Sequence, residues 1–457
     1  MKNRIILLLA VLWTFLPLAS QITFTGNSHE VMEIVPAATT GLNRIYVLHD
    51  TENVAMHFTA TTENEVTWYV FEERGGAYAE PVANVTHNGL ETILPQVTGN
   101  RGYIIEEGTS RLYVWVTDYS TYRLSLTGLQ VDNDGDCATT TLHVAGEGTD
   151  IAYYTINGGR QVLSRELELS YYNLEWNDTT HWQQTSVVET ETSFKNTIVI
   201  PAPTCNTSFV LSGDRFLSFW DETLVAESNA YVTAAVDVRA TATQESRDND
   251  NEKKTDAAGG QLGGSAPAHV FFEAFVTDAV VHKEWQMALD PDFNDIQLRL
   301  NQDEVDETFT EAGTYYWRFI GSNADGSCEA YSETFTVNIG ESELQCPNVF
   351  TPGTSEGVND VWKVSYRSII DFHCWIFNRW GVKVCEFTDP SQGWDGRNNG
   401  KLVGPGVYYY VIQATGSDGK KYKMSGDINI IRYKNARGGS SSGGTDNPTT
   451  HEDPDEP

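Results

Sequence analysis

Basic side chains are scarce in this chain of 457 residues. The 30 Lys and Arg residues stand against 63 Asp and Glu residues, which gives a formal net charge of −33. Such a charge repels phosphate backbones, so the composition argues against nucleic-acid binding. The deficit is uneven, because residues 346–437 carry twelve basic and eight acidic residues. We therefore expect the C-terminal part to be a chemically distinct unit.

Long apolar runs are absent except at the N-terminus. Lys2 and Arg4 precede the apolar run Ile5–Leu18, and Leu18-Ala19-Ser20 offers a cleavage site that would leave Gln21 as the new N-terminus. This is the pattern of a secretory signal peptide over residues 1–20. A membrane anchor is the alternative, but the run is short for a span. No Cys follows it, which argues against a lipoprotein, and no later stretch predicts a transmembrane span.

Catalytic signatures are also lacking. The sequence contains no HExxH, no GxSxG, no Walker A motif and no GxGxxG after a strand, and its ten His residues show no ligand spacing. We therefore predict that the chain is not an enzyme and has no catalytic residue, cofactor or bound metal. The many acids remain compatible with a carboxylate pair for glycoside hydrolysis, but no motif marks one.

Calcium is the one small ligand that the acids suggest. Asp132, Asp134 and Asp136 alternate like the first ligands of a calcium loop, but Cys137 stands where that loop needs Gly, and His143 stands at position twelve. A second acidic turn contains Asp290, Asp292 and Asp295. Turn chemistry, in which Asp binds its own backbone, is the preferred interpretation of both clusters.

Cysteines are few, and none forms a CxxC motif. An even number in an exported chain permits disulfides. Domain order favours the pairs Cys137–Cys205, Cys328–Cys346 and Cys374–Cys385. Buried free thiols are the open alternative.

The last of these pairs depends on a hairpin register. A four-residue loop over Asn378–Gly381 would pair Phe377 with Val382 and set Cys374 opposite Cys385. A three-residue loop with a bulge would set Cys374 against Glu386 and turn the thiols apart. The sequence leaves both registers open.

Helical periodicity is weak, and period-two alternation dominates. Val66–Phe71 and Leu112–Val116 are short β-branched and aromatic runs between Asn, Asp and Gly clusters. This pattern predicts an all-β chain of tandem Ig-like and PKD-like β-sandwiches, with Trp68 and Trp285 in the cores.

Composition shifts divide the chain into successive parts. Residues 244–267 are polar and poor in apolar side chains, so we expect a disordered loop there, with an interdomain linker as the alternative. The predicted parts are a signal peptide (1–20), an Ig-like sandwich (21–134), a second sandwich (135–227), a PKD-like sandwich (228–340), a small C-terminal β-sandwich (341–433) and a disordered acidic tail (434–457).

The densest set of motifs lies near the C-terminus. Turn glycines alternate there with aromatic anchors, and an Asp-Gly turn follows a Gly-led strand at residue 406 just as one follows the Gly-led strand at residue 313. The motif residues are Pro347, Asn348, Phe350, Asn359, Asp360, Asn378, Arg379, Trp380, Gly381, Trp394, Asp395, Gly396, Gly406, Tyr408, Tyr410 and Gly426.

This ordered set resembles the gliding-motility-associated C-terminal domain of the Bacteroidetes, which is the type B sorting domain of the type IX secretion system. The resemblance covers about residues 346–433, and the part before it is similar to PKD-like sandwiches. It implies passage through the outer membrane with the type IX translocon as partner, and attachment or release at the cell surface. The sequence departs from the family in the loop after Pro352 and in the tail beyond Tyr433, which puts efficient sorting in question.

These observations favour a secreted or cell-surface protein whose sandwich modules serve adhesion or stalk roles. The partners of those modules would be a surface glycan or a protein. Two alternatives stay open: a carbohydrate-active or other secreted enzyme with the same sorting domain, and a structural component of the secretion or outer-membrane machinery.

Overall fold

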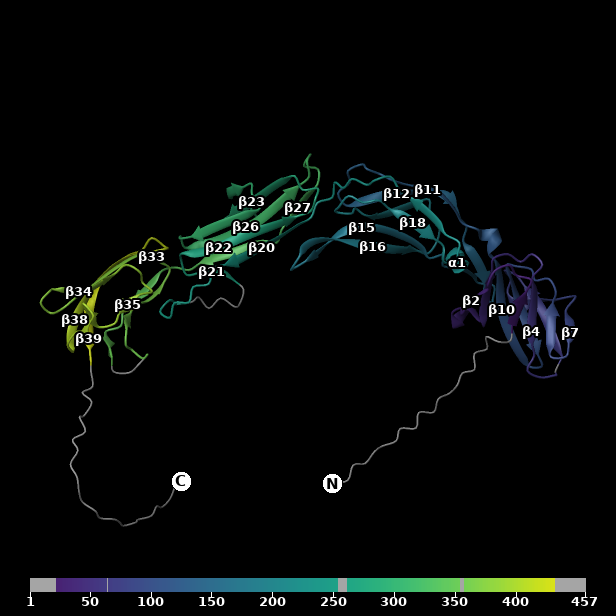
Figure 1. The fold of residues 1–457 in the computed structure, drawn as a ribbon, viewed down its shortest axis with the longest axis horizontal. Helices are drawn as coiled ribbons and strands as arrows, with labels where there is room; N and C mark the ends of the chain where they lie inside the picture. The colour runs from purple at the N-terminus through teal and green to yellow at the C-terminus, as the bar shows by residue number, and fades with distance from the viewer. Residues whose placement is uncertain (1–21, 64, 254–260, 354–356, 432–457) are drawn as a thin grey trace, which may run out of the picture. The chain divides into compact units, whose positions relative to one another are not determined.

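The computed structural model describes residues 22–63, 65–253, 261–353 and 357–431. These residues form an almost entirely β structure, as the alternation predicts (Figure 1). The predicted signal peptide and acidic tail lie outside the described residues. Among the described residues, no helix has the length and apolar character needed to cross a membrane.

The first sandwich contains two sheets, with strand orders β1-β4-β8-β7 and β2-β3-β10-β9-β5-β6. Trp68 on β5 lies in the core at 3 % exposure and donates to Thr92 Oγ1 at 3.1 Å. The predicted core position of Trp68 is thus confirmed. The elements are β1 (Ile22–Thr25), β2 (Met32–Ile34), η2 (Ala38–Thr40), β3 (Arg44–Leu48), β4 (Ala55–Thr59), β5 (Val66–Phe71), η3 (Gly76–Tyr78), β6 (Glu80–Pro81), β7 (Thr86–Asn88), β8 (Glu91–Leu94), β9 (Arg101–Glu107), β10 (Ser110–Asp118) and η4 (Tyr119–Tyr122).

The second sandwich follows without a break in the hydrophobic core. Its sheets are β11-β12-β17, β13-β14 and β16-β15-β18-β19. One cluster of buried side chains runs from Trp115 of the first sandwich to Phe209 and Phe216 of the second. The elements are β11 (Ser125–Val131), β12 (Thr139–Glu147), β13 (Ile151–Tyr154), β14 (Arg160–Leu163), β15 (Leu167–Asn177), β16 (His181–Glu191), β17 (Thr197–Pro201), β18 (Val210–Gly213), α1 (Arg215–Phe219) and β19 (Leu224–Glu227).

A buried ion pair stabilises the connection between these two sandwiches. Arg165 and Asp214 form the pair at 1 % and 0 % exposure. Asp214 also accepts from the Tyr119 hydroxyl at 3.1 Å, and Arg165 donates to the carbonyls of Tyr122 and Thr149 at 2.5 and 2.7 Å. Because Tyr119 and Tyr122 belong to η4 at the end of the first sandwich, this network joins the two.

The third sandwich has sheets β20-β22-β25 and β21-β28-β26-β23-β24, with β27 on β26. Phe272 stacks on Trp317 with ring centroids 4.7 Å apart, and Trp285 is fully buried beside them, as predicted. The strands are β20 (Val238–Gln244), β21 (Leu262–Gly264), β22 (Ala268–Val276), β23 (His282–Ala288), β24 (Ile296–Leu300), β25 (Glu304–Phe309), β26 (Gly313–Ser322), β27 (Glu329–Tyr331) and β28 (Phe335–Ile339).

The C-terminal domain is built on the five-stranded sheet β30-β39-β38-β33-β34, with three small two-stranded sheets. Its own cluster of buried side chains includes Trp362, Phe372, Ile376, Trp394 and Ile412. The strands are β29 (Glu343–Gln345), β30 (Val349–Phe350), β31 (Trp362–Lys363), β32 (Ser365–Arg367), β33 (Ile369–Phe377), β34 (Lys383–Phe387), β35 (Gly393–Trp394), β36 (Arg397–Asn398), β37 (Lys401–Leu402), β38 (Gly406–Gly416) and β39 (Lys421–Ile430).

The described residues separate into two compact units. The first contains the two N-terminal sandwiches together with residues 275–282 and 321–330. The second contains residues 239–274 and 283–320 and the chain from residue 331 onward. The third sandwich therefore contributes residues to both units.

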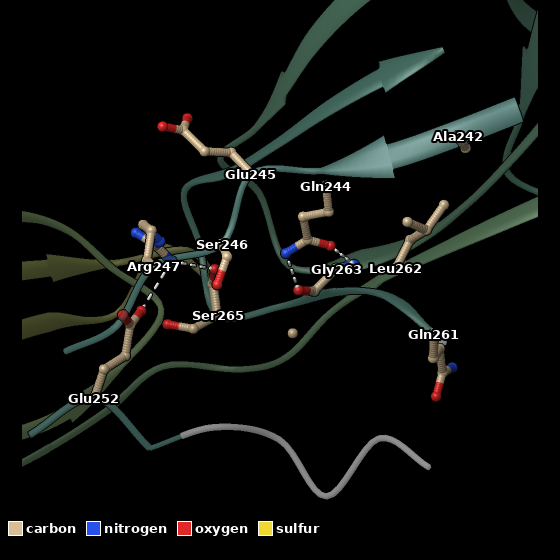
Figure 2. Close-up of a pocket in the computed structure, with 11 residues that line it drawn as sticks. Ala242, Gln244, Glu245, Ser246, Arg247, Glu252, Gln261, Leu262, Gly263 and Ser265 are labelled. Carbon is tan, nitrogen blue, oxygen red and sulfur yellow. Dashed lines mark hydrogen bonds and ion pairs between the residues drawn. The ribbon is translucent and has the colours of Figure 1, made fainter. Parts of the chain in front are cut away.

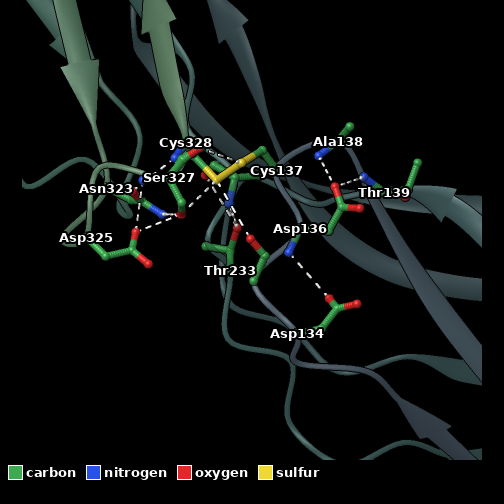
Figure 3. Close-up of a disulfide and its surroundings, with 12 residues drawn as sticks. Asp134, Asp136, Cys137, Ala138, Thr139, Thr233, Asn323, Asp325, Ser327 and Cys328 are labelled. Carbon is green, nitrogen blue, oxygen red and sulfur yellow. Dashed lines mark hydrogen bonds between the residues drawn. A yellow bond between two sulfur atoms is a disulfide. The ribbon is translucent and has the colours of Figure 1, made fainter.

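The single disulfide of the described residues lies in the first unit and differs from the predicted pairs. Cys137 bonds to Cys328, while Cys205, Cys346, Cys374 and Cys385 are free thiols (Figure 3). The predicted pairs Cys137–Cys205 and Cys328–Cys346 are wrong. Chain order suggested pairing within neighbouring segments, whereas this bond joins two turns that are 191 residues apart in sequence.

The predicted pair Cys374–Cys385 is also wrong, although Phe377 opposite Lys383 is the register predicted for the three-residue loop. Cys374 lies opposite Phe387, and Cys385 lies opposite Ile376. The register shifts next to Ile376, where Val384 is the extra residue. The loop and the bulge each move the register by one residue relative to a pairing of Cys374 with Cys385, so the two thiols lie two positions apart.

Acidic turns surround the disulfide and use their carboxylates on the backbone. Asp136 Oδ1 accepts from the amides of Ala138 and Thr139 at 2.8 and 3.2 Å, and Asp325 Oδ1 accepts from the Ser327 amide at 3.0 Å (Figure 3). Asp290 likewise accepts from the Asp292 amide at 3.1 Å. These hydrogen bonds are the turn chemistry expected for both acidic clusters.

Much of the segment predicted to be a disordered loop, residues 244–267, makes specific hydrogen bonds in the structure. Gln244 and Gly263 exchange two hydrogen bonds, and Arg247 donates to Glu252 and to the Ser265 carbonyl at 2.8 Å (Figure 2). These residues line a cavity of about 460 Å³. Residues 254–260 lie outside the described residues.

The same polar segment packs on the C-terminal domain within the second unit. The Lys253 amide donates to the Tyr366 carbonyl at 2.7 Å, and Asn251 Nδ2 donates to the carbonyls of Val364 and Pro390 at 2.8 and 2.7 Å. Backbone and amide hydrogen bonds order a segment that lacks apolar side chains. The composition-based prediction weighed only apolar burial, so it missed these bonds.

Candidate sorting domain

The C-terminal motif residues converge on one small domain, and most of them shape its turns. Asn378 Oδ1 accepts from the amides of Trp380 and Val382, both at 3.0 Å. Gly381 has a φ of 77°, which favours glycine. Within the Asn378-Arg379-Trp380-Gly381 motif, the Asn378 side chain therefore closes the β33–β34 hairpin.

A second turn motif closes the loop after Phe350. The Asp360 carboxylate accepts from the amides of Gly353 and Gly357 at 3.0 and 2.8 Å. The Thr351 amide donates to the carbonyl of Asn359 at 2.8 Å. Because both motif residues bind backbone groups on the opposite side of the loop, they hold its two ends together.

Trp394 anchors a third turn motif of the domain. Trp394 is buried, and its indole N–H donates to the Arg397 carbonyl at 2.9 Å. Asp395 Oδ1 accepts from the Arg397 amide at 2.9 Å. A side chain at Gly396 would meet Pro352 at 2.7 Å, so this position needs glycine for both φ and space.

Four further motif residues fit the core together. Gly426 lies opposite Tyr410 in the β38–β39 pair, and a Cβ there would stand 2.7 Å from the Tyr410 hydroxyl. The Pro347 carbonyl accepts from the Trp362 indole at 2.7 Å, and the Asn348 carbonyl accepts from the Asn429 amide at 2.8 Å. The remaining motif residues also lie in this domain: Phe350 packs on Trp394, Tyr408 donates to the Gly404 carbonyl, and Gly406 begins β38.

The free thiols of the domain are part of its packing. Cys374 is fully buried, and burial raises its pKa. Burial likewise raises the pKa of Cys346 to about 11. Both are therefore neutral thiols at physiological pH and behave as small hydrophobic side chains.

The outward face of the five-stranded sheet carries an exposed apolar strip. We define this strip as Val407, Tyr409 and Val411 on β38 with Trp375 and Phe377 on β33. Tyr409 lies opposite Phe377, and Val411 lies opposite Trp375. The three β38 side chains are 37–47 % exposed.

The rim of this strip is charged, and the hairpin tip is aromatic. Hydrogen bonds from Lys383 and His373 lower the pKa of Glu386 to about 2, so this carboxylate is ionised. At the tip, Trp380 is 73 % exposed, and the Arg379 guanidinium lies 4.3 Å from its ring centroid. A contiguous exposed apolar surface with a polar rim is typical of a protein-binding site.

Comparison with known families decides the nature of this domain. Residues 344–430 match the CHU_C type IX secretion signal domain. The match confirms the resemblance inferred from the motifs, and it implies that the chain is exported to the cell surface or secreted. The sorting domain, as we call residues 341–431, contains all sixteen motif residues. Most of them serve the fold of the domain.

The second sandwich also matches a family. Residues 130–228 match a fibronectin type III domain model, Fn3_FA. No curated protein matches this chain.

Among solved structures, the tetra-tandem repeat in the extending region of a large adhesion protein aligns over 84 % of this chain and 96 % of that chain, with 11 % identity and a TM-score of 0.21. Three N-terminal domains of the bacteriophage RB49 highly immunogenic outer capsid protein (Hoc) align over 68 % of this chain and 100 % of that chain, with 10 % identity and a TM-score of 0.22. TM-scores this low carry no argument about function.

One constellation escaped the sequence analysis. His29, His49 and Glu222 place ligand atoms within 4.8 Å of one another, the single such group of three His, Cys, Asp or Glu residues in the described part of the chain. The separation of Glu222 from the two histidines in sequence hides the group, since no local motif spans it.

Proposed function

We propose that this chain is a non-enzymatic cargo of the type IX secretion system, in which the sorting domain directs export and the sandwiches form a stalk or adhesive surface. The observation that carries the proposal is the family match over residues 344–430. The low basic content and the absence of catalytic motifs agree with it.

The stalk role is supported by the way consecutive domains are joined within each unit. In the first unit, the continuous core, the Arg165–Asp214 pair and the Cys137–Cys328 disulfide connect neighbouring segments. In the second unit, the Ala266 amide donates to Ser368 Oγ at 3.1 Å. Joints with buried or covalent contacts resist bending more than flexible linkers do.

We further propose that the exposed apolar strip is the surface that the secretion machinery recognises. A signal domain must present a feature that its translocon binds. The strip is apolar, accessible and rimmed by charge, and Val407, Tyr409 and Val411 are its most exposed members.

Replacing Tyr409 and Val411 together by serine should reduce surface export roughly tenfold, because a loss of about 1.4 kcal/mol in binding is a tenfold change. The measurement is the amount of protein on intact cells against the periplasmic amount. Val188→Ser with Val199→Ser removes comparably exposed apolar side chains from the second sandwich and should leave export unchanged. Equal export of the two double variants would refute the role of the strip.

A further inference from the structure

His29, His49 and Glu222 come together where the first sandwich meets the second. His29 lies in the loop between β1 and β2, His49 directly follows β3, and Glu222 follows α1. His49 Nε2 is 2.9 Å from Glu222 Oε1, and the two imidazole rings lie 3.9 Å apart. All three residues are partly buried.

Outer hydrogen bonds fix the tautomers of both imidazoles. The Ser28 hydroxyl donates its one proton to Asp50 Oδ2 at 3.2 Å, so at 2.9 Å from His29 Nδ1 it must accept. His49 Nδ1 lies 3.1 Å from the same Asp50 oxygen, which can only accept when ionised. Both Nδ1 atoms therefore carry protons, and in a neutral imidazole this leaves Nε2 as the nitrogen that can bind a metal.

This arrangement leaves a pair of electron donors facing each other. The His49 Nε2 lone pair points toward a carboxylate oxygen of Glu222, which also has only lone pairs to offer. Arg123 contacts His49 Nε2 at 3.3 Å and pairs with the other oxygen of Glu222. A divalent cation between Nε2 and Oε1 would bind both lone pairs, and it would take the place of the Arg123 contact to His49.

The surroundings have the features of a supported metal site. A carboxylate on the far nitrogen of a ligating imidazole is the usual second layer of such sites, and Asp50 holds that position for His49. Trp220 packs edge-on against His49 at 5.1 Å between ring centroids, and its indole donates to the Glu30 carbonyl at 2.7 Å. That bond anchors the loop that carries His29.

We infer that His29, His49 and Glu222 bind one divalent transition-metal ion of the Zn²⁺ type at the junction of the first two sandwiches. Two imidazoles and one carboxylate are the donor set that such ions prefer. Donor atoms around a tetrahedral ion lie about 3.4 Å apart, so the group must contract. Because the ion lies in the plane of each ligating ring, His29 must also turn out of its stack.

The test is Zn²⁺ titration of the metal-free mature chain by calorimetry, with millimolar Mg²⁺ present to occupy exposed carboxylates. We expect one saturable equivalent. His29→Ala and Glu222→Gln should each weaken binding about 100-fold, and Asp50→Asn about tenfold, as expected for loss of an outer partner. Circular dichroism of each metal-free variant checks its fold. His29 lies in the loop between β1 and β2, so its replacement should disturb the fold least.

A matched control is His143→Ala. His143 is an exposed imidazole with one carboxylate partner, Asp132 at 3.0 Å, and belongs to no group of three. Its loss should leave the affinity unchanged. Co²⁺ should give visible d–d absorption in the wild-type chain and in His143→Ala but not in the double variant of His29 and Glu222. Absence of a saturable equivalent, or binding that survives the double variant, would overturn the inference.

Discussion

Replacing Asp214 by alanine is expected to destabilise the first unit by about 3–5 kcal/mol. The substitution leaves the Arg165 guanidinium buried at 1 % exposure without its counter-charge, and removing one partner of a buried pair costs about this much. Asp214 also caps α1 by accepting from the Leu217 amide at 3.1 Å and holds the Tyr119 hydroxyl. Its loss should therefore loosen the contact between the first two sandwiches.

Urea denaturation followed by tryptophan fluorescence measures this effect. Asp150→Ala provides the control, because its pair with Arg160 is exposed at 3.4 Å and should contribute less than about 1 kcal/mol. If Asp214→Ala and Asp150→Ala shift the first transition equally, the buried network does not stabilise the junction.

Loss of the Cys137–Cys328 disulfide should have the second large effect. The bond closes a loop over a sequence separation of 191 residues. In the chain-entropy model, such a loop corresponds to a stabilisation of up to about 5 kcal/mol. Cys328→Ser should therefore lower the denaturation midpoint of the first unit far more than Cys385→Ser, which replaces a half-buried free thiol.

Non-reducing peptide mapping of the mature protein checks the pairing itself. A linked peptide pair containing Cys137 and Cys328 is expected, while Cys205, Cys346, Cys374 and Cys385 should be alkylated after unfolding without reductant. A Cys137–Cys205 link would contradict the structure and restore the pairing expected from domain order.

Sequence patterns predicted the parts of this molecule that depend on local chemistry. Alternation predicted the β class, and Trp68 and Trp285 occupy the cores because bulky aromatic side chains in mid-strand must be buried. The order of turn glycines and aromatic anchors was sufficient to indicate the sorting domain, since several of the motifs close a turn within a few residues. Asn378 is an example, because both of its amide contacts are within four residues.

Features that depend on distant contacts were missed. Cys137 pairs with a residue 191 positions away, and no spacing rule reaches that far. The bulge at Val384 adds one residue to the register shift that the three-residue loop already makes, although the turn itself is local. Residues 244–253 are ordered by backbone bonds to Tyr366, which their composition does not reveal. Glu222 meets His49 only after two sandwiches have packed together.

Surface display is the most direct test of the central claim, that the sorting domain directs export. The full chain and a variant lacking residues 346–433 would be expressed in the same cells, and intact cells would be treated with protease. We expect the full chain to be accessible to protease or released into the medium. The shortened chain should remain folded, protected and periplasmic. Surface exposure of the shortened chain at the level of the full chain would contradict the account.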